Sequence, residues 1–458
     1  MGSCDLAIDS MIEDFSKLAL DDFKIIPPML RLPSDILYQL FLSSAPSDPI
    51  ENVLETVRLS HVCSGWRSII LQAPLLWTYV NMYMTSSGVE HSAVMTSFFR
   101  RSKNLPLTFH LFADIDVDRR RREELGRIIS PHTSRFRALY IMVDPLVSLQ
   151  SPLDAIISFP MPLLCHFDLA VQNQQRCTVF MEPRPQSSNA YFIVPDSPTP
   201  YLDWTVRGYN LTTLSLKYLD LLPADLLPIL MMTQKSLIHL ELYNDYMVGV
   251  PARLPYITLP NLISFRVGYR RPAVVAHLVK LLILPKLASL TVHDFGSCPD
   301  STTPRRMQDT FFKVVPNKDA TELLTAMCPF GSVGNLKLLG VTCPSTPLPG
   351  LLQPLQYLFQ AVKSLSLVLC DADFLDALVE ATVVASPTLL ENLSELTITS
   401  EDYPLVLNYL SLRASRGLPR LKLLSVNPRM AVLRHFYADY AEGLRVVGRR
   451  KQRVNKDI

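Results

Sequence analysis

The chain has 458 residues, of which 48% are hydrophobic and 19% charged, and its formal net charge is +2. This composition predicts a folded protein of two or three domains or one extended array, and gives no overall charge that would attract nucleic acid or an anionic membrane. The eight cysteines are scattered without a Cys-x-x-Cys pair, which favours reduced thiols in an intracellular protein and argues against a structural zinc site.

The chain begins with an expected tail, residues 1–29, that is acidic at its start and lacks the apolar core of a secretory signal. Residues 30–85 then predict three short amphipathic helices. Pro33 and Ser34 mark the first helix start, with Ser34 a candidate N-cap. A segment this short cannot bury two full apolar stripes in its own core. We therefore expect part of each stripe to contact a partner. The stripes are Ile36, Leu37, Leu40 and Phe41, followed by Leu59, Val62, Cys63, Trp66 and Ile69 or Ile70.

These helices also carry a string of residues that resembles the F-box motif. The order and spacing match at Leu32, Pro33, Ile36, Leu37, Phe41, Val62, Cys63, Trp66, Arg67, Leu76 and Trp77. The first loop, residues 43–50, is longer than in the family, but loops tolerate insertion. The stretch 101–107, Arg-Ser-x-x-x-Pro-Leu, makes the chain most similar to fungal F-box proteins.

The resemblance implies that the head docks on a Skp-type adaptor of a cullin-based ubiquitin ligase. The alternative is a bare three-helix cap for the domain that follows. The residues expected to bind the adaptor are Leu32, Pro33, Ile36, Leu37, Leu40, Phe41, Val62, Trp66, Leu76 and Trp77.

Beyond the head, the pattern Leu-x-x-Leu-x-Leu, with apolar substitutes, recurs from Phe136 to Val426. Its first positions are mostly 25 to 31 residues apart, and we expect each of the two wider gaps, of 47 and 49 residues, to hide a degenerate or interrupted repeat. The ten matches are Phe136-Leu139-Ile141, Leu164-Phe167-Leu169, Leu211-Leu214-Leu216, Leu237-Leu240-Leu242, Leu262-Phe265-Val267, Leu287-Leu290-Val292, Leu336-Leu339-Val341, Val362-Leu365-Leu367, Leu393-Leu396-Ile398 and Leu421-Leu424-Val426.

This period resembles that of leucine-rich repeats, and predicts an α/β fold in which residues 86–445 form an irregular leucine-rich-repeat solenoid. Each unit would supply a short strand with inward leucines and a helix that crosses back, as at 274–284, 320–327 and 373–386. The alternative is one large α/β domain with parallel strands. Proline-rich inserts near 172–205 and 296–316 either shape a binding face or are disordered.

No nucleophile elbow, zinc-binding helix, phosphate loop or dinucleotide fingerprint occurs, so we expect no catalytic, cofactor-binding or metal-binding residues. The polar residues that flank the inward leucines favour recognition instead, because they would line one strip of the sheet. Substrate contact is expected mainly in the first half of the array, since later positions such as Leu338 and Gly340 lack charge. The candidates are His166, Asp168, Lys217, His239, Glu241, Tyr243, Arg266 and His293.

By resemblance, the chain is expected to be the non-catalytic substrate-recognition subunit of a Skp–cullin–F-box ubiquitin ligase, in the cytoplasm or nucleus, with no nucleic acid or membrane partner. The alternatives are a leucine-rich-repeat scaffold without a link to ubiquitin and, less favoured, an α/β hydrolase. The basic tail, 446–458, is either a nuclear-import signal or a solvated end. The sequence identifies neither the substrate nor any modification the substrate requires.

Overall fold

The computed structural model divides the chain into two compact units, which are described separately. Unit 1 comprises Met1–Asn81 and Ala93–Leu105, and unit 2 comprises Met82–Ser92 and Pro106–Ile458. The structure describes residues 32–44, 49–85, 88–90, 92–113, 119–143, 156, 159–171, 210–217, 223–243, 255–269, 272–294, 321–341, 357–370, 374–376, 378–379, 390–399, 403–427, 437 and 439–447. The two predicted inserts, 172–205 and 296–316, lie outside these residues.

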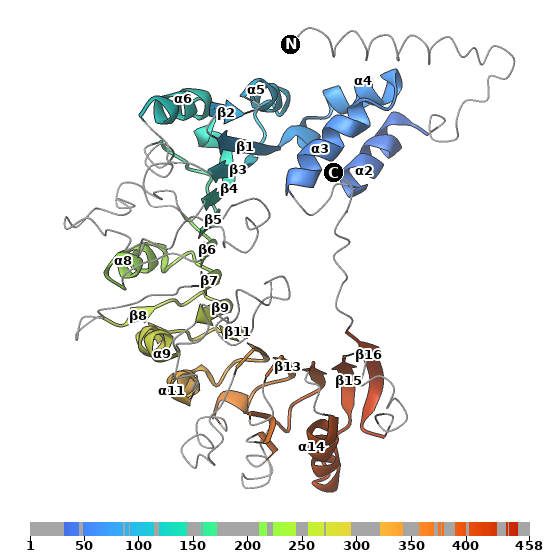
Figure 1. Cartoon of the computed structure of the whole chain (residues 1–458), viewed down its shortest axis with the longest axis vertical. Coiled ribbons are helices and arrows are strands. Elements are labelled where there is room, and N and C mark those ends of the chain that lie inside the picture. Colours follow the sequence, from blue (N-terminus) through green and yellow to red (C-terminus); the bar gives the residue numbers. More distant parts are fainter. Residues whose placement is uncertain are drawn as a thin grey trace, which may run out of the picture. The chain divides into compact units, whose positions relative to one another are not determined.

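Unit 1 is built from short helices (Figure 1). Its elements are α2 (Ser34–Ser44), α3 (Pro49–Ser60), α4 (Ser64–Gln72), the 3-10 helix η2 (Pro74–Trp77) and α5 (Ser92–Arg101). The unit extends beyond the predicted head, because Phe98 of α5 packs edge-on against Trp77 with ring centroids 4.7 Å apart.

The core of unit 1 is centred on two tryptophans. The Phe41 ring meets Trp66 at 4.8 Å, edge to face. The Trp77 side chain is buried, and its Nε1 donates a 2.8 Å hydrogen bond to the Ile70 carbonyl. A buried indole needs such an acceptor, so this bond fixes η2 against α4. The guanidinium of Arg101 covers the Trp77 ring at 4.3 Å.

Unit 2 contains a sheet of 14 strands, and all the pairs from β3 to β16 for which a register is defined are parallel. The order is β16-β15-β14-β13-β12-β11-β9-β7-β6-β5-β4-β3-β1-β2. The strands are β1 (Tyr79–Thr85), β2 (Gly88–Glu90), β3 (Leu107–Ala113), β4 (Phe136–Val143), β5 (His166–Val171), β6 (Thr213–Lys217), β7 (His239–Tyr243), β9 (Ser264–Tyr269), β11 (Ser289–Asp294), β12 (Asn335–Leu339), β13 (Ser364–Val368), β14 (Glu395–Ile398), β15 (Leu421–Val426) and β16 (Ala441–Val446).

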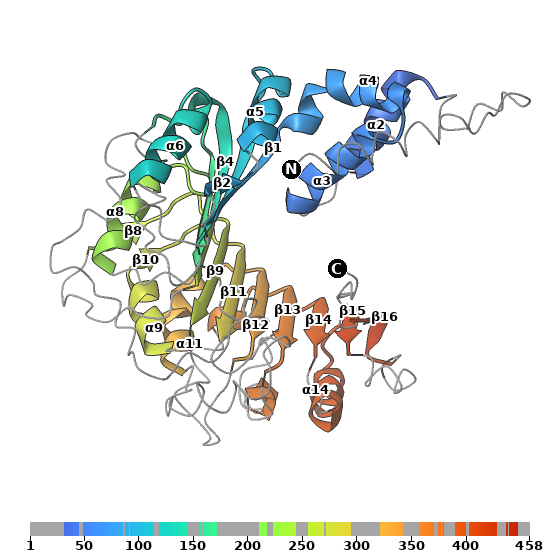
Figure 2. The same ribbon diagram turned by 45° about the horizontal axis from the view of Figure 1, so that its top comes forward.

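The helices of unit 2 lie on one side of this sheet (Figures 1 and 2). They are α6 (Arg119–Ile129), α8 (Pro223–Thr233), α9 (Pro272–Lys280), α11 (Thr321–Ala326) and α14 (Tyr403–Ser415), with 3-10 turns η3 (Thr133–Arg135) and η6 (Cys328–Phe330). A second, two-stranded sheet joins β8 (Ile257–Thr258) to β10 (Leu282–Ile283) in parallel.

The register brings the repeated leucines into continuous rows. Leu240, Phe265, Leu290, Leu336, Leu365 and Leu396 follow one another as partners in adjacent strands. Leu240, Leu290, Leu365 and Leu396 are at most 1% exposed, whereas His239 is exposed and Glu241, Thr291 and Thr397 are half-buried. The predicted α/β class and the burial of these four leucines are therefore confirmed.

Neither of the two wide gaps adds a strand to the sheet, so a degenerate further repeat there is wrong, whereas an interrupted repeat agrees with the strand pairing. β5 pairs directly with β6, so that Phe167 lies beside Leu214, and β11 pairs directly with β12, so that Leu290 lies beside Leu336. The extra chain therefore joins neighbouring strands instead of adding one to the sheet. Lengthening a connection costs little entropy, so the sheet continues across such an insertion.

The predicted match Leu336-Leu339-Val341 is also misplaced. Leu336 and Leu338 are the row positions, both at most 2% exposed, and Val333 takes the first position. Leu339 points to the opposite face of the sheet. Leu338 is therefore not one of the positions beside the inward leucines at which polar residues were expected. In the run Leu-Lys-Leu-Leu-Gly-Val, apolar residues at every second position can be read in two ways: as Leu336 and Leu338, or as Leu339 and Val341. The two readings put opposite faces of the strand inward, because a shift by one residue exchanges the faces.

Four strands of the main sheet, β1, β2, β3 and β16, lie outside the predicted repeat pattern. In β3, Leu107 lies beside Phe136, the first position of the next repeat, but only one residue separates Leu107 from Phe109. The buried residues Leu107, Phe109 and Leu111 therefore alternate without matching Leu-x-x-Leu-x-Leu. β16 has Ala441 at the first position, beside Leu421 of β15.

Candidate interaction surfaces

The predicted adaptor residues of unit 1 divide into exposed and buried groups. Ile36 and Leu40, one helical turn apart on α2, are 45% and 40% exposed, and Val62, in the turn before α4, is 59% exposed. Pro33 is exposed and Leu32 and Trp66 are half-buried. These six residues are accessible to a partner in unit 1 taken by itself.

Four of the predicted adaptor residues lie in the core of unit 1. Leu37, Phe41, Leu76 and Trp77 are between 1% and 5% exposed. The apolar stripe on α2 is thus split: Leu37 and Phe41 pack inward, while Ile36 and Leu40 remain at the surface. A side chain that is already buried holds the helices together and contributes to a partner contact only by fixing the exposed neighbours.

All eight predicted substrate residues belong to one face of the sheet in unit 2, opposite to the helices, which we call the distal face. Its middle row runs through Tyr140, Asp168, Ser215, Glu241, Arg266, Thr291 and Lys337. The flanking rows hold His166 and His239 on one side and Lys217, Tyr243 and His293 on the other. The register therefore gathers residues that are up to 127 positions apart in the sequence, from His166 to His293.

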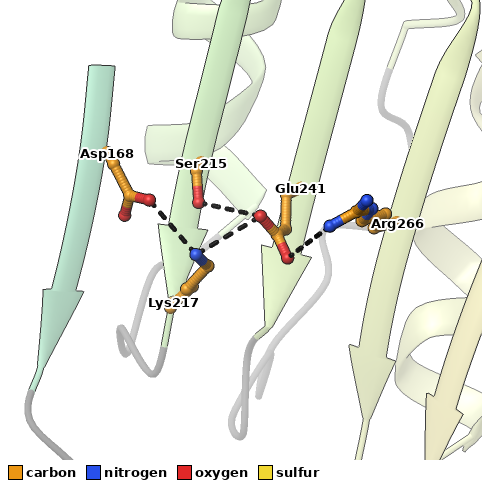
Figure 3. Close-up of polar contacts among 5 residues, drawn as sticks. All are labelled: Asp168, Ser215, Lys217, Glu241 and Arg266. Atoms are coloured by element: carbon orange, nitrogen blue, oxygen red, sulfur yellow. Dashed lines mark hydrogen bonds and ion pairs between the residues drawn. The ribbon is translucent and has the colours of Figure 1, made fainter. Parts of the chain in front are cut away.

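The charges in this set pair with one another (Figure 3). Lys217 Nζ lies 3.1 Å from Asp168 Oδ2 and 3.3 Å from Glu241 Oε2. The Ser215 hydroxyl donates to the same Glu241 oxygen at 3.3 Å. Arg266 Nη1 approaches Glu241 Oε1 only to 3.9 Å, beyond hydrogen-bond distance. Asp168, Lys217 and Glu241 thus form a compact network, with Arg266 at its end.

This environment shifts two pKa values. Burial by itself would lower the pKa of Lys217, but the carboxylates of Asp168 and Glu241 outweigh burial and raise it above its ordinary value of 10.5. Burial lowers the pKa of His166 from its ordinary 6.5, although Asp168 and Glu241 act in the opposite direction. Lys217 is therefore a cation and His166 a neutral ring near pH 7.

The structure adds an aromatic row that the sequence pattern did not reveal. His110 of β3 stacks on Tyr140 of β4 with centroids 4.2 Å apart, and Tyr140 meets His166 of β5 at 4.7 Å. Tyr83 stacks on Phe112 at 4.9 Å. The only sequence signal was the alternation of polar or aromatic residues with buried ones, and β3 was not recognised as a strand.

Tyr243 occupies an unusual position because a glycine stands beside it. Gly268 is its partner on β9, and a Cβ at residue 268 would overlap the Tyr243 ring. The ring leans across this strand and meets His293 of β11 edge-on, with centroids 5.7 Å apart. The glycine is what allows an aromatic side chain to bridge three strands.

No protein-family model matches the chain, and no curated protein shows significant similarity to it. None of the helices in the described part of the chain is both long and apolar enough to span a membrane. Among the described residues, no group of three or more His, Cys, Asp or Glu side chains is placed to hold a metal ion.

Proposed function

We propose that this protein is the substrate-recognition subunit of a Skp–cullin–F-box ubiquitin ligase, in which unit 1 docks the adaptor and the distal face of unit 2 holds the substrate. The observation that carries the proposal is the exposure of Ile36, Leu40 and Val62 in a helical head whose residues resemble the F-box. The protein itself would catalyse nothing. It would raise the concentration of substrate lysines near a ubiquitin-conjugating enzyme.

The head supports this role because its exposed apolar side chains are numerous for so small a unit. Clusters of exposed apolar side chains are typical of protein interfaces. The core already holds Leu37, Phe41 and Trp77, so the exposed residues are not needed to fold the helices. Among the described residues of unit 1, the exposed large apolar ones are Ile36, Leu40, Leu54, Val62, Leu71, Leu75, Tyr79 and Val94.

Unit 2 supports the other half of the proposal through its architecture, in which parallel strands of one register are separated by helices on one side. We interpret this array as an irregular leucine-rich-repeat solenoid. The distal face then presents residues from many repeats side by side, as repeat proteins do when they bind a protein partner.

The test is binding of a purified Skp-type adaptor to the full-length chain and to the double variant Ile36→Asp, Leu40→Asp. Each residue would lose an apolar contact and bring a charge into the interface, and single interface anchors are worth about 2–4 kcal/mol. We therefore expect adaptor affinity to fall by about 100-fold or more. The matched control is Ile263→Asp, Ile283→Asp in unit 2, because these isoleucines are 45% and 47% exposed.

Adaptor binding at the wild-type level in the Ile36, Leu40 variant, with both proteins folded, would contradict the proposed docking surface. Failure of the wild-type chain to bind the adaptor, together with the absence of a cullin from its purified complexes, would favour a scaffold without a link to ubiquitin.

A further inference from the structure

The middle of the distal face carries an excess of positive charge. The strands β9, β11 and β12 place three residues each on this face, and these include two cations but no carboxylate. The neighbouring strands β5, β6 and β7 place two carboxylates and one lysine there. The positions on β9, β11 and β12 are Ser264, Arg266, Gly268, Ser289, Thr291, His293, Asn335, Lys337 and Leu339.

The two cations lie on the same row, on either side of a hydroxyl. Thr291 is the register partner of both Arg266 and Lys337. Neighbouring strands are about 4.8 Å apart, so the Cα atoms of the two cations are separated by about 10 Å. Both side chains are long and flexible enough for their charged ends to meet over Thr291.

Neither cation is neutralised by the network beside it. Arg266 is 58% exposed, and its nearest carboxylate, Glu241, is 3.9 Å away and already bonded to Lys217 and Ser215. Lys337 is exposed, and its side chain makes no hydrogen bond or ion pair within the described part of the chain. On strands β5 to β12, three cations, Lys217, Arg266 and Lys337, therefore accompany two carboxylates, Asp168 and Glu241, and the next carboxylate of the face, Glu395, lies two strands beyond β12.

We propose that Arg266, Thr291 and Lys337 form an anchor for a single carboxylate, an Asp or Glu side chain in a segment of the protein substrate. This inference rests on the proposed function, in which the distal face holds the substrate. A carboxylate would balance the one positive charge in excess, accept hydrogen bonds from both cations and take a third from the Thr291 hydroxyl.

The surroundings of the anchor favour one negative charge over two. A phosphorylated side chain brings about −1.5 to −2 charges, more than the excess on this face. On one side of Thr291, Ser289 and Asn335 offer further donors. On the other side, the Tyr243 ring meets His293 edge-on, with centroids 5.7 Å apart.

The experiment measures binding of the purified full-length chain to three fluorescent nine-residue peptide libraries. The libraries are degenerate in uncharged residues and differ only at the central position, which is Glu, Gln or phosphothreonine. We expect the Glu library to bind at least tenfold more tightly than the Gln library, with a preference that weakens as salt is raised. Lys337→Gln and Thr291→Val should each remove most of this preference, and Arg266→Gln should do the same.

The matched control is Lys363→Gln, since Lys363 is an exposed lysine in the turn before β13 and not on the distal face. It should bind the Glu library like the wild type. Equal binding of the Glu and Gln libraries, stronger binding of the phosphothreonine library, or an unchanged preference in Lys337→Gln would each overturn the anchor.

Adaptor binding by the same preparations separates the two proposals. Preference for Glu without adaptor binding would keep the anchor and reject the ubiquitin-ligase role. Adaptor binding without a preference for Glu would keep that role and reject the anchor.

Discussion

The two faces of the sheet in unit 2 are made by the same strands but obey different rules. On the helix side, Leu240, Leu290 and Leu396 occupy one unbroken apolar row and are at most 1% exposed. On the distal face, the middle row changes from aromatic at Tyr140, through paired charges at Glu241, to hydroxyl groups farther along. The difference teaches that the apolar row on the helix side sets the register of the strands. The residue types on the distal face are free to vary, because those side chains contact only their neighbours on the same face.

The sharpest test of this contrast changes adjacent residues of β11. Leu290→Ala should lower the free energy of unfolding by about 2–5 kcal/mol, because it leaves a cavity in the row. Thr291→Ala, its neighbour on the other face, should change it by no more than about 0.5 kcal/mol. Urea denaturation of the full chain measures both. Similar losses for the two variants would show that the faces are not energetically distinct.

A second test concerns a polar exception on the helix side. Arg413 of α14 is 3% exposed and donates to the carbonyls of Leu390 and Leu393, both at 2.8 Å, and to Pro419 at 3.1 Å. Arg413→Met would remove the donors of the Leu393 and Pro419 carbonyls, while the Leu390 carbonyl would keep its hydrogen bond from the Leu393 N–H. We expect a loss of about 2–4 kcal/mol in unfolding free energy.

Arg413→Lys should recover only part of that loss, because an ammonium cannot reproduce the fork of the guanidinium. The exposed Lys422→Met is the control. An unchanged free energy of unfolding in Arg413→Met would mean that apolar packing alone stabilises this end of the array.

A third test asks whether the distal face contains any position as demanding as the helix side. Gly268→Ala would force the Tyr243 ring to move, so we expect a loss of about 1–3 kcal/mol. Adding Tyr243→Ala should remove most of this cost, as a double-mutant cycle would show. Gly126→Ala in α6 is the control, since its Cβ would lie 3.5 Å from Phe159, an ordinary contact. Additive effects of the two changes would contradict the proposed overlap.

The smallest expected effect is a pH dependence from the distal face. Burial lowers the pKa of His166 in the folded state, with Asp168, Lys217, Glu241 and His239 nearby. The folded state therefore prefers the neutral ring, and this stabilisation is complete above the unfolded pKa of about 6.5 and is lost as the pH falls below it.

The drop in denaturation midpoint between pH 7.5 and pH 5.5 should thus be smaller in His166→Gln than in the wild type. His132, whose pKa is also lowered by burial, contributes equally to both proteins. An identical drop in the two proteins would remove His166 as a source of the pH dependence.

By itself, the sequence determined the α/β class, the strand positions of nine of the ten repeats and the inward side of each of those strands. It could do so because Leu-x-x-Leu-x-Leu is a local pattern and a strand alternates its faces with a period of two. The same local rule failed at Leu336 to Val341, where two alternations were available and only pairing with Leu290 selects one.

Only the tertiary structure decided which residues meet. The sequence nominated Asp168, Lys217 and Glu241 as separate recognition residues, but their register makes them partners of one another. The sequence did not indicate Lys337, which lies 71 positions after Arg266. The two residues share one row only because β11 lies between their strands. Likewise, the apolar stripe of α2 could not reveal that Phe41 packs on Trp66 while Leu40 stays exposed. Contacts of this kind are set by the packing of distant segments, which no local periodicity encodes.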